Sequence, residues 1–156
     1  MMDFDTAFTR LLGHEGGYVN DPRDKGGETQ WGISKRSYPT LNIATLTEWD
    51  AKQIYRRDFW DRIKADELPE AVRFDVFDGA VNSGIAQSAM WLQRAVGVSD
   101  DGVIGPQTLA ACRLLAGSMV KARYCGHRLA FMAGLSTWPA FGRGWARRIA
   151  DNLKEV

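Results

Sequence analysis

Glu15, Asp24 and Thr29 are the residues whose types and spacing could do chemistry in this chain. Glu15 follows an apolar-periodic segment and precedes two glycines, which let the backbone turn sharply. Asp24 lies nine residues beyond Glu15, and Thr29 lies five beyond Asp24. Glycoside hydrolysis needs one carboxylic acid that protonates the leaving oxygen and a second carboxylate that supports positive charge or a water. A threonine hydroxyl nearby could position that water.

The residues before Glu15 predict a helix that begins after an N-cap at Asp3 and runs to Glu15. One face of this helix would carry Phe4, Phe8, Leu11, Leu12 and Glu15. Partial desolvation and the negative end of the helix dipole would then raise the pKa of Glu15, as a general acid requires. The alternative is a frayed helix end with Glu15 in water, and periodicity alone favours neither.

Turn formation is an alternative explanation for the acids that follow Glu15. Asp21, Asp24 and Glu28 lie in NDP and DKGGE segments, which form turns without any catalytic role. Their spacing does not match an EF-hand calcium loop. We therefore predict no metal site and no cofactor.

The remaining pattern predicts a compact, mainly α protein with a small β-hairpin or irregular lobe near the N-terminus. Extended segments around residues 18–19 and 29–33, joined by a turn at 24–27, would form the lobe. Capping, proline and glycine signals predict later helices at 69–82, 85–96 and 106–117, others that begin near Thr47 and Ser118, and a last helix striped by Phe141, Trp145, Ile149 and Leu153.

Charge and length exclude some classes of protein. The chain has 156 residues, enough for one domain, and a net charge of +1, which argues against a dedicated nucleic-acid binder. Residues 118–156 carry seven basic and two acidic side chains, a local net charge of +5. A solvated basic face explains this excess, and attraction to an anionic polymer is the alternative.

Two further features concern the compartment in which the protein works. Cys112 and Cys125 lie in apolar helical patterns, so we expect buried free thiols. The opening MMDFDTAF lacks the cations of a secretory signal, and no apolar run reaches membrane-spanning length. We therefore expect synthesis in the cytoplasm without a classical export signal, and no stable membrane insertion.

The segment EGGYVNDPRDKGGETQWGIS, residues 15–34, resembles the opening signature of glycoside hydrolase family 108, the phage and prophage-type N-acetylmuramidases. The resemblance continues in FDVFDGAVNSG (74–84), LQRAVGVSDDGVIGPQTL (92–109) and GWARR (144–148), so it covers essentially the whole chain. It implies a lysozyme-like fold that cleaves the β-1,4 bond between N-acetylmuramic acid and N-acetylglucosamine. It also implies a catalytic region over 1–86 and a helical peptidoglycan-binding region over 87–156, packed into one compact unit.

The resemblance assigns the catalytic acid to Glu15. Other phage-type lysozymes show a Glu, eight residues, Asp, five residues, Thr pattern, and Glu15 and Asp24 fit it. The threonine position falls on Gln30 instead, with Thr29 one residue early. The roles of Asp24 and Thr29 therefore stay open. The predicted substrate-binding residues are Tyr18, Asn20, Gln30, Trp31 and Asn82, with a packing or turn role as the alternative for each.

Three functions are compatible with these residues and motifs. The first is a peptidoglycan muramidase with Glu15 as the general acid. The second is a lytic transglycosylase on the same bond, and the third is a non-catalytic wall-binding protein. Peptidoglycan glycan strands are the expected partner of a monomer. The resemblance also implies that a holin or a secretion system would release it to the wall in the periplasm.

Overall fold

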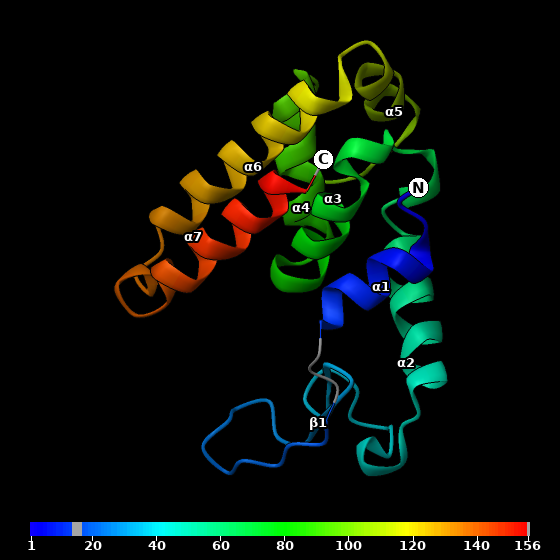
Figure 1. The fold of residues 1–156 in the computed structure, drawn as a ribbon, viewed down its shortest axis with the longest axis vertical. Coiled ribbons are helices and arrows are strands. Elements are labelled where there is room, and N and C mark those ends of the chain that lie inside the picture. Colours follow the sequence, from blue (N-terminus) through cyan, green and yellow to red (C-terminus); the bar gives the residue numbers. More distant parts are fainter. Residues whose placement is uncertain (14–16, 156) are drawn as a thin grey trace. The chain divides into compact units, whose positions relative to one another are not determined.

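The structure is a computed structural model that describes residues 1–13 and 17–155 of the chain. The chain divides into two compact units (Figure 1). One comprises Asp3–Asp58, and the other comprises Met1–Met2 with Phe59–Val156. The first unit carries the small lobe, and the second is a bundle of helices.

The first unit begins with helix α1, Phe4–Leu12. Its predicted N-cap is confirmed, because the Asp3 carboxylate accepts a hydrogen bond from the Thr6 amide at 2.9 Å. The predicted helix is too long at its other end. Gly13 has a φ of 57°, a left-handed value that glycine adopts without strain and that ends the helix. Glu15 lies outside the described residues.

Helix α2, Glu48–Tyr55, opens with the predicted capping box. The Asp50 amide donates to the Thr47 hydroxyl at 3.1 Å, and the Thr47 amide donates to the Asp50 carboxylate at 3.0 Å. Tyr55 is buried and meets the Phe8 ring edge-on, with centroids 5.5 Å apart, so this contact joins α2 to α1. A 3-10 turn, Ile43–Thr45, precedes α2, and a π-helical turn, Arg56–Trp60, follows it.

The predicted lobe is confirmed, with one difference in its course. Strands β1, Thr29–Gln30, and β2, Ile33–Ser34, pair antiparallel, and Val19 bridges to Thr29. The sequence pattern predicts one extended segment over residues 29–33. The chain instead reverses direction at the Trp31-Gly32 dipeptide, where both residues have positive φ.

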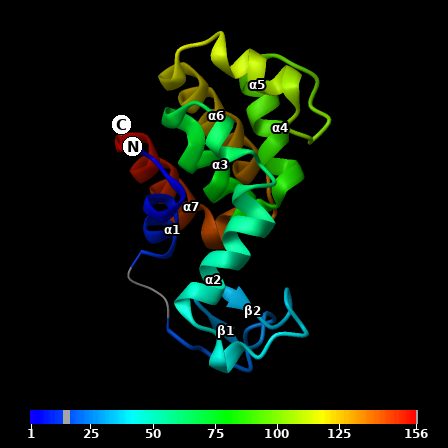
Figure 2. The ribbon, with the colours of Figure 1, turned by 90° about the vertical axis from the view of Figure 1, so that its right-hand side faces the viewer.

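The second unit packs helices α3, Glu70–Ser83, α4, Ile85–Val96, and α6, Gly117–Ala133, against one another (Figure 2). Helix α7, Trp138–Lys154, runs antiparallel along α6, and the short α5, Pro106–Arg113, contacts α4 and α6. A 3-10 turn, Ala65–Glu67, precedes α3. Fully buried aromatic residues form the core, with Trp60 against Phe77 and Trp91 against Tyr124.

A buried carboxylate ties three of these helices together. Asp78 on α3 is fully buried, and it accepts hydrogen bonds from Arg128 on α6 at 2.6 Å and from Arg148 on α7 at 2.5 Å. Asn152 donates a further bond at 3.2 Å. Burial alone would raise the pKa of Asp78, but the hydrogen bonds and charges of the two arginines outweigh it and lower the pKa.

The connection between α4 and α5 is held by one buried amide. Gln93 donates to the Asp101 carboxylate at 2.7 Å and to the Val103 carbonyl at 3.0 Å, and it accepts from the Gly102 amide at 2.9 Å. The chain turns at Asp101-Gly102, where Gly102 has a φ of 80°. Gln93 therefore fixes the loop that follows the C-terminus of α4.

Several predicted boundaries differ from the structure. Helix α5 ends at Arg113, and α6 begins at Gly117 without a side-chain cap from Ser118. The predicted apolar stripe of α7 is only partly buried, because Phe141 is 57% and Leu153 43% exposed while Ile149 is buried. The stop of α4 at Gly97 and the start of α5 at Pro106 are confirmed.

The two cysteines are buried free thiols, as expected. Burial raises the pKa of Cys112 to about 11 and that of Cys125 to about 12, so both stay protonated near neutral pH. In the described part of the chain, no helix combines the length and apolar character needed to cross a bilayer.

Replacing Asp78 by Asn should destabilise the protein by about 3–5 kcal/mol, because Arg128 would remain buried without its counter-charge. Thermal or urea unfolding measures the loss. The exposed Asp151, which pairs with the equally exposed Lys154, provides the control variant Asp151→Asn, and its stability should barely change. Equal melting temperatures for the two variants would contradict this role for Asp78.

The ion pairs of Asp78 should also make the stability of the protein depend on pH. Because the folded-state pKa of Asp78 lies below its ordinary value of 3.8, its contribution is complete above that value and is lost as the pH falls through the lower folded-state pKa. The Asn variant should therefore lose less stability than the wild type over that acid range.

Candidate active site

The candidate site residues of the first unit gather on the hairpin lobe between Gly17 and Leu46. Antiparallel hydrogen bonds at 2.8 Å join Val19 to Thr29 in both directions, which brings the segment after Gly17 alongside β1. Tyr18, Asn20, Asp24, Thr29, Gln30 and Trp31 all belong to this lobe. Asn82 belongs to the other unit, and Glu15 lies outside the described residues.

Trp31 is held in a conformation that costs energy. With φ values of 53° and 75°, Trp31 and Gly32 form the two-residue turn between the strands. Glycine fits the second position, where a Cβ would collide with the Tyr55 hydroxyl. A non-glycine residue at the first position is strained by about 1–2 kcal/mol. Strain of this kind is commonly retained at functional sites.

Two hydrogen bonds offset the strain at Trp31. The Tyr55 hydroxyl donates to the Trp31 carbonyl at 3.2 Å, and the Trp31 indole N–H donates to the Leu46 carbonyl at 3.1 Å. Burial raises the pKa of Tyr55 to about 12, so its hydroxyl remains a donor at neutral pH. The indole is therefore fixed and half-buried, and it has a defined face to offer a ligand.

Asp24 forms part of a turn, the role that the sequence analysis gave as the alternative to catalysis. Its Oδ1 accepts from the Gly26 amide at 2.8 Å, and its carbonyl accepts from the Gly27 amide at 3.1 Å. This is an Asx-type turn, in which the side chain shapes the backbone. Asp24 is exposed, so its carboxylate also faces solvent.

The other two acids of the lobe have side-chain partners. Glu28 accepts a hydrogen bond from the Tyr18 hydroxyl at 2.9 Å, and this bond raises the pKa of Tyr18. Arg23 pairs with Asp21 at 2.8 Å and lowers the pKa of that carboxyl. Asp21 is therefore ionised at neutral pH and unsuited to proton donation. Glu28, which the sequence suggested only as a turn former, is half-buried and holds the Tyr18 hydroxyl.

Thr29 and Gln30 form β1 and are both half-buried. The Thr29 hydroxyl has a long contact of 3.5 Å to the Gly27 carbonyl. The side-chain oxygen of Gln30 is buried, with no hydrogen-bond partner among the described residues. On α3, Asn82 is exposed and donates to the Asp78 carbonyl at 2.7 Å.

Three aromatic residues on α7, Trp138, Phe141 and Trp145, form a cluster. The sequence placed Phe141 and Trp145 on the apolar stripe of this helix. Trp145 lies 5.8 Å from Phe141 and 6.1 Å from Trp138 between ring centroids. Gly142 makes room for Trp138, because a Cβ there would collide with the indole. Phe141 is 57% exposed, so the cluster presents an aromatic surface of the kind on which sugar rings stack. The exposed aromatic surface was missed because helical spacing alone does not distinguish a buried from an exposed stripe.

In the ranges 1–13 and 17–155, the structure contains no group of three or more His, Cys, Asp and Glu side chains arranged to hold a metal ion. The described part of the lobe offers carboxylates, amides, hydroxyls, lysine and arginine cations, and a fixed indole.

Comparisons with known proteins identify the family. Residues 8–84 match the family described as Glycosyl hydrolase 108, and residues 87–150 match that described as Predicted Peptidoglycan domain. The structure is similar to that of Brucella abortus SagA, with a TM-score of 0.86 and 36% sequence identity, over 97% of this chain and 91% of that one. No curated protein matches the chain.

These comparisons confirm the predicted fold class, a mainly α, lysozyme-like fold with a small N-terminal lobe. The two family matches meet between residues 84 and 87, whereas the two compact units meet between Asp58 and Phe59. The division into a catalytic region over 1–86 and a binding region over 87–156 stays a prediction. The chain belongs to glycosyl hydrolase family 108 and is a glycoside hydrolase that acts on peptidoglycan.

Proposed function

We propose that the protein is an N-acetylmuramidase, which hydrolyses the β-1,4 bond between N-acetylmuramic acid and N-acetylglucosamine, with Glu15 as the general acid. The observation that carries the proposal is that the family-108 match spans both Glu15 and the entire hairpin lobe. Glu15 protonates the glycosidic oxygen as the bond breaks, and the sugar that keeps the positive charge is then attacked by water.

Asp24 supports that positive charge or orients the water, with Thr29 as a hydroxyl partner. Its solvent-facing carboxylate on the hairpin lobe is consistent with either role. The Asx turn fixes one carboxylate oxygen and so orients the group. The separation of the two carboxyls decides between retention and inversion of the sugar configuration.

Trp31 provides the main apolar contact to the glycan. Its N–H is occupied by the Leu46 carbonyl, so the ring face is the part that remains for a sugar. Tyr18, Asn20 and Gln30 supply polar contacts in this proposal, and a substrate-binding role for Asn82 on the other unit stays a prediction. Delivery to the wall by a holin or a secretion system stays a prediction.

Glu15→Gln should abolish wall lysis while leaving the fold intact, because glutamine cannot donate the proton. General acid catalysis is typically worth a factor of about 100 to 10,000. Turbidity loss of permeabilised Gram-negative cells measures the rate.

The control for Glu15→Gln is Glu48→Gln on the exposed start of α2, which should lyse cells at the wild-type rate. A Glu15→Gln variant that lyses cells as fast as this control would refute the assignment of the acid.

Asp24 can be tested with a pair of variants, because asparagine preserves the Asx turn whereas alanine removes it. Asp24→Asn should keep the wild-type melting temperature and lose activity by less than Glu15→Gln does. Asp24→Ala should lose both activity and stability. If Asp24→Asn retains full activity, the residue serves the turn alone.

Trp31→Asn tests the strained position, since asparagine tolerates a left-handed backbone. We expect a melting temperature close to that of the wild type and hydrolysis of soluble glycan chains weakened about tenfold, equivalent to ~1.4 kcal/mol. Unchanged hydrolysis together with a lower melting temperature would show that the indole only stabilises the lobe.

A further inference from the structure

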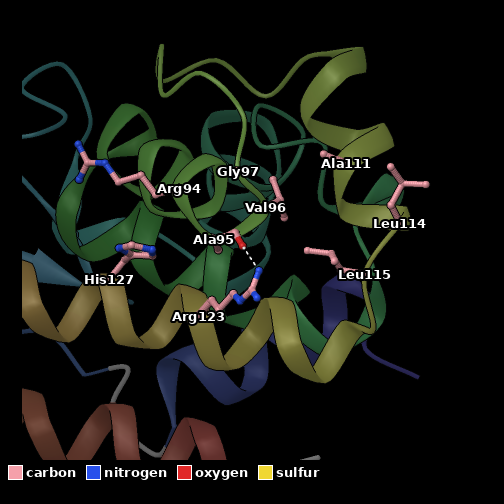
Figure 3. Close-up of a pocket in the computed structure, with 9 residues that line it drawn as sticks. All are labelled: Arg94, Ala95, Val96, Gly97, Ala111, Leu114, Leu115, Arg123 and His127. Carbon is pink, nitrogen blue, oxygen red and sulfur yellow. Dashed lines mark hydrogen bonds between the residues drawn. The ribbon is translucent and has the colours of Figure 1, made fainter.

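A pocket with a volume of about 460 Å³ lies between the C-terminus of α4, helix α5 and helix α6 (Figure 3). Its size is within the range of pockets that bind small ligands. Every residue that lines it falls inside the match to the predicted peptidoglycan domain, and all of them belong to the second compact unit. The pocket is therefore distinct from the hairpin lobe.

One side of the pocket is basic. Figure 3 shows Arg94 from α4 and Arg123 and His127 from α6 along this side. All three are exposed, and Arg123 is held across the pocket by a hydrogen bond of 3.4 Å to the Ala95 carbonyl. Asp100 pairs with Arg94 at 2.8 Å and offsets part of its charge. Arg123 and His127 form no ion pair with a described residue, so they are available to an anionic ligand.

The opposite side is apolar. Ala111, Leu114 and Leu115 line it in Figure 3. Leu114 is 85% exposed, an unusually large exposure for a leucine that follows directly on a helix. A ligand that places carboxylates on one side and small aliphatic groups on the other would match both halves of the pocket.

We propose that this pocket binds the stem peptide of peptidoglycan. The backbone sugars of the glycan are largely neutral, whereas the stem peptide carries several carboxylates next to alanine methyl groups. Arg123 and His127 bind a carboxylate, with Arg94 assisting, and the leucines contact a methyl group. The inference rests on the proposed function for its substrate, and it assigns peptide recognition to α4–α6 and hydrolysis to Glu15 together with the hairpin lobe.

The test is a calorimetric or NMR titration of the full chain with N-acetyl-L-alanyl-γ-D-glutamyl-meso-diaminopimelyl-D-alanine. The same peptide with its carboxyls amidated and a peptide-free chitooligosaccharide serve as comparison ligands. The wild type should bind the acidic peptide with resonance shifts at residues 94–97 and 111–127, and it should bind the amidated peptide at least about tenfold more weakly.

Arg123→Gln and His127→Asn should each weaken binding of the acidic peptide, by roughly tenfold for the arginine. Arg123→Lys should restore part of the affinity. The matched control is Arg113→Gln, an exposed arginine of α5 that does not line the pocket, and it should bind like the wild type. Equal binding by Arg113→Gln and Arg123→Gln would overturn the proposal.

The outcome is separable from that of the proposed function. If the wild type hydrolyses peptidoglycan but does not bind the acidic peptide, the pocket proposal is wrong and the muramidase proposal stands. If the acidic peptide binds with the expected loss in Arg123→Gln but no glycan bond is cut, the pocket proposal stands and the muramidase proposal is wrong.

Discussion

The ion pairs of Asp78 are the constraint on which the helical unit depends. A buried carboxylate is costly to remove from water, and it is tolerated here because Arg128, Arg148 and Asn152 satisfy it from two other helices. The next residue, Gly79, serves the same junction, because a Cβ there would collide with the Tyr124 hydroxyl of α6. Within the FDVFDGAVNSG segment, Asp78 and Gly79 are therefore two positions at which α3 packs against the other helices.

This junction changes how the basic C-terminal third is interpreted. Of its seven basic residues, Arg128 and Arg148 are bound by Asp78, and Lys121 is nearly buried 3.8 Å from Asp75 with a hydrogen bond to the Glu155 carbonyl. Fewer cations are thus available to an anionic polymer than the local net charge of +5 suggests. The exposed ones that remain without an ion pair to any described residue include Arg123 in the pocket and Arg143 and Arg147 on α7.

Sequence patterns predicted the parts of the fold that are set by local chemistry. Asp3, the Thr47–Asp50 pair, Gly97 and Pro106 mark helix ends correctly because capping depends on residues a few positions apart. The turn at Trp31-Gly32 was missed, since tryptophan rarely adopts a left-handed conformation and needs Tyr55 and Leu46, which are distant in sequence. The role of Asp78 was likewise invisible, because its partners lie 50 and 70 residues away.

The sequence predicted which residues belong to the candidate site, and the structure showed the hydrogen bonds that position their side chains. Six of the predicted residues fall on one lobe, while the role of Asp24 in the turn and the bond from Tyr18 to Glu28 emerged only from the structure.

The most direct measurement of the central claim is mass spectrometry of the fragments released from purified peptidoglycan. Hydrolysis by an N-acetylmuramidase predicts fragments with reducing N-acetylmuramic acid ends. Anhydro-muramic ends, or reducing N-acetylglucosamine ends, would contradict it.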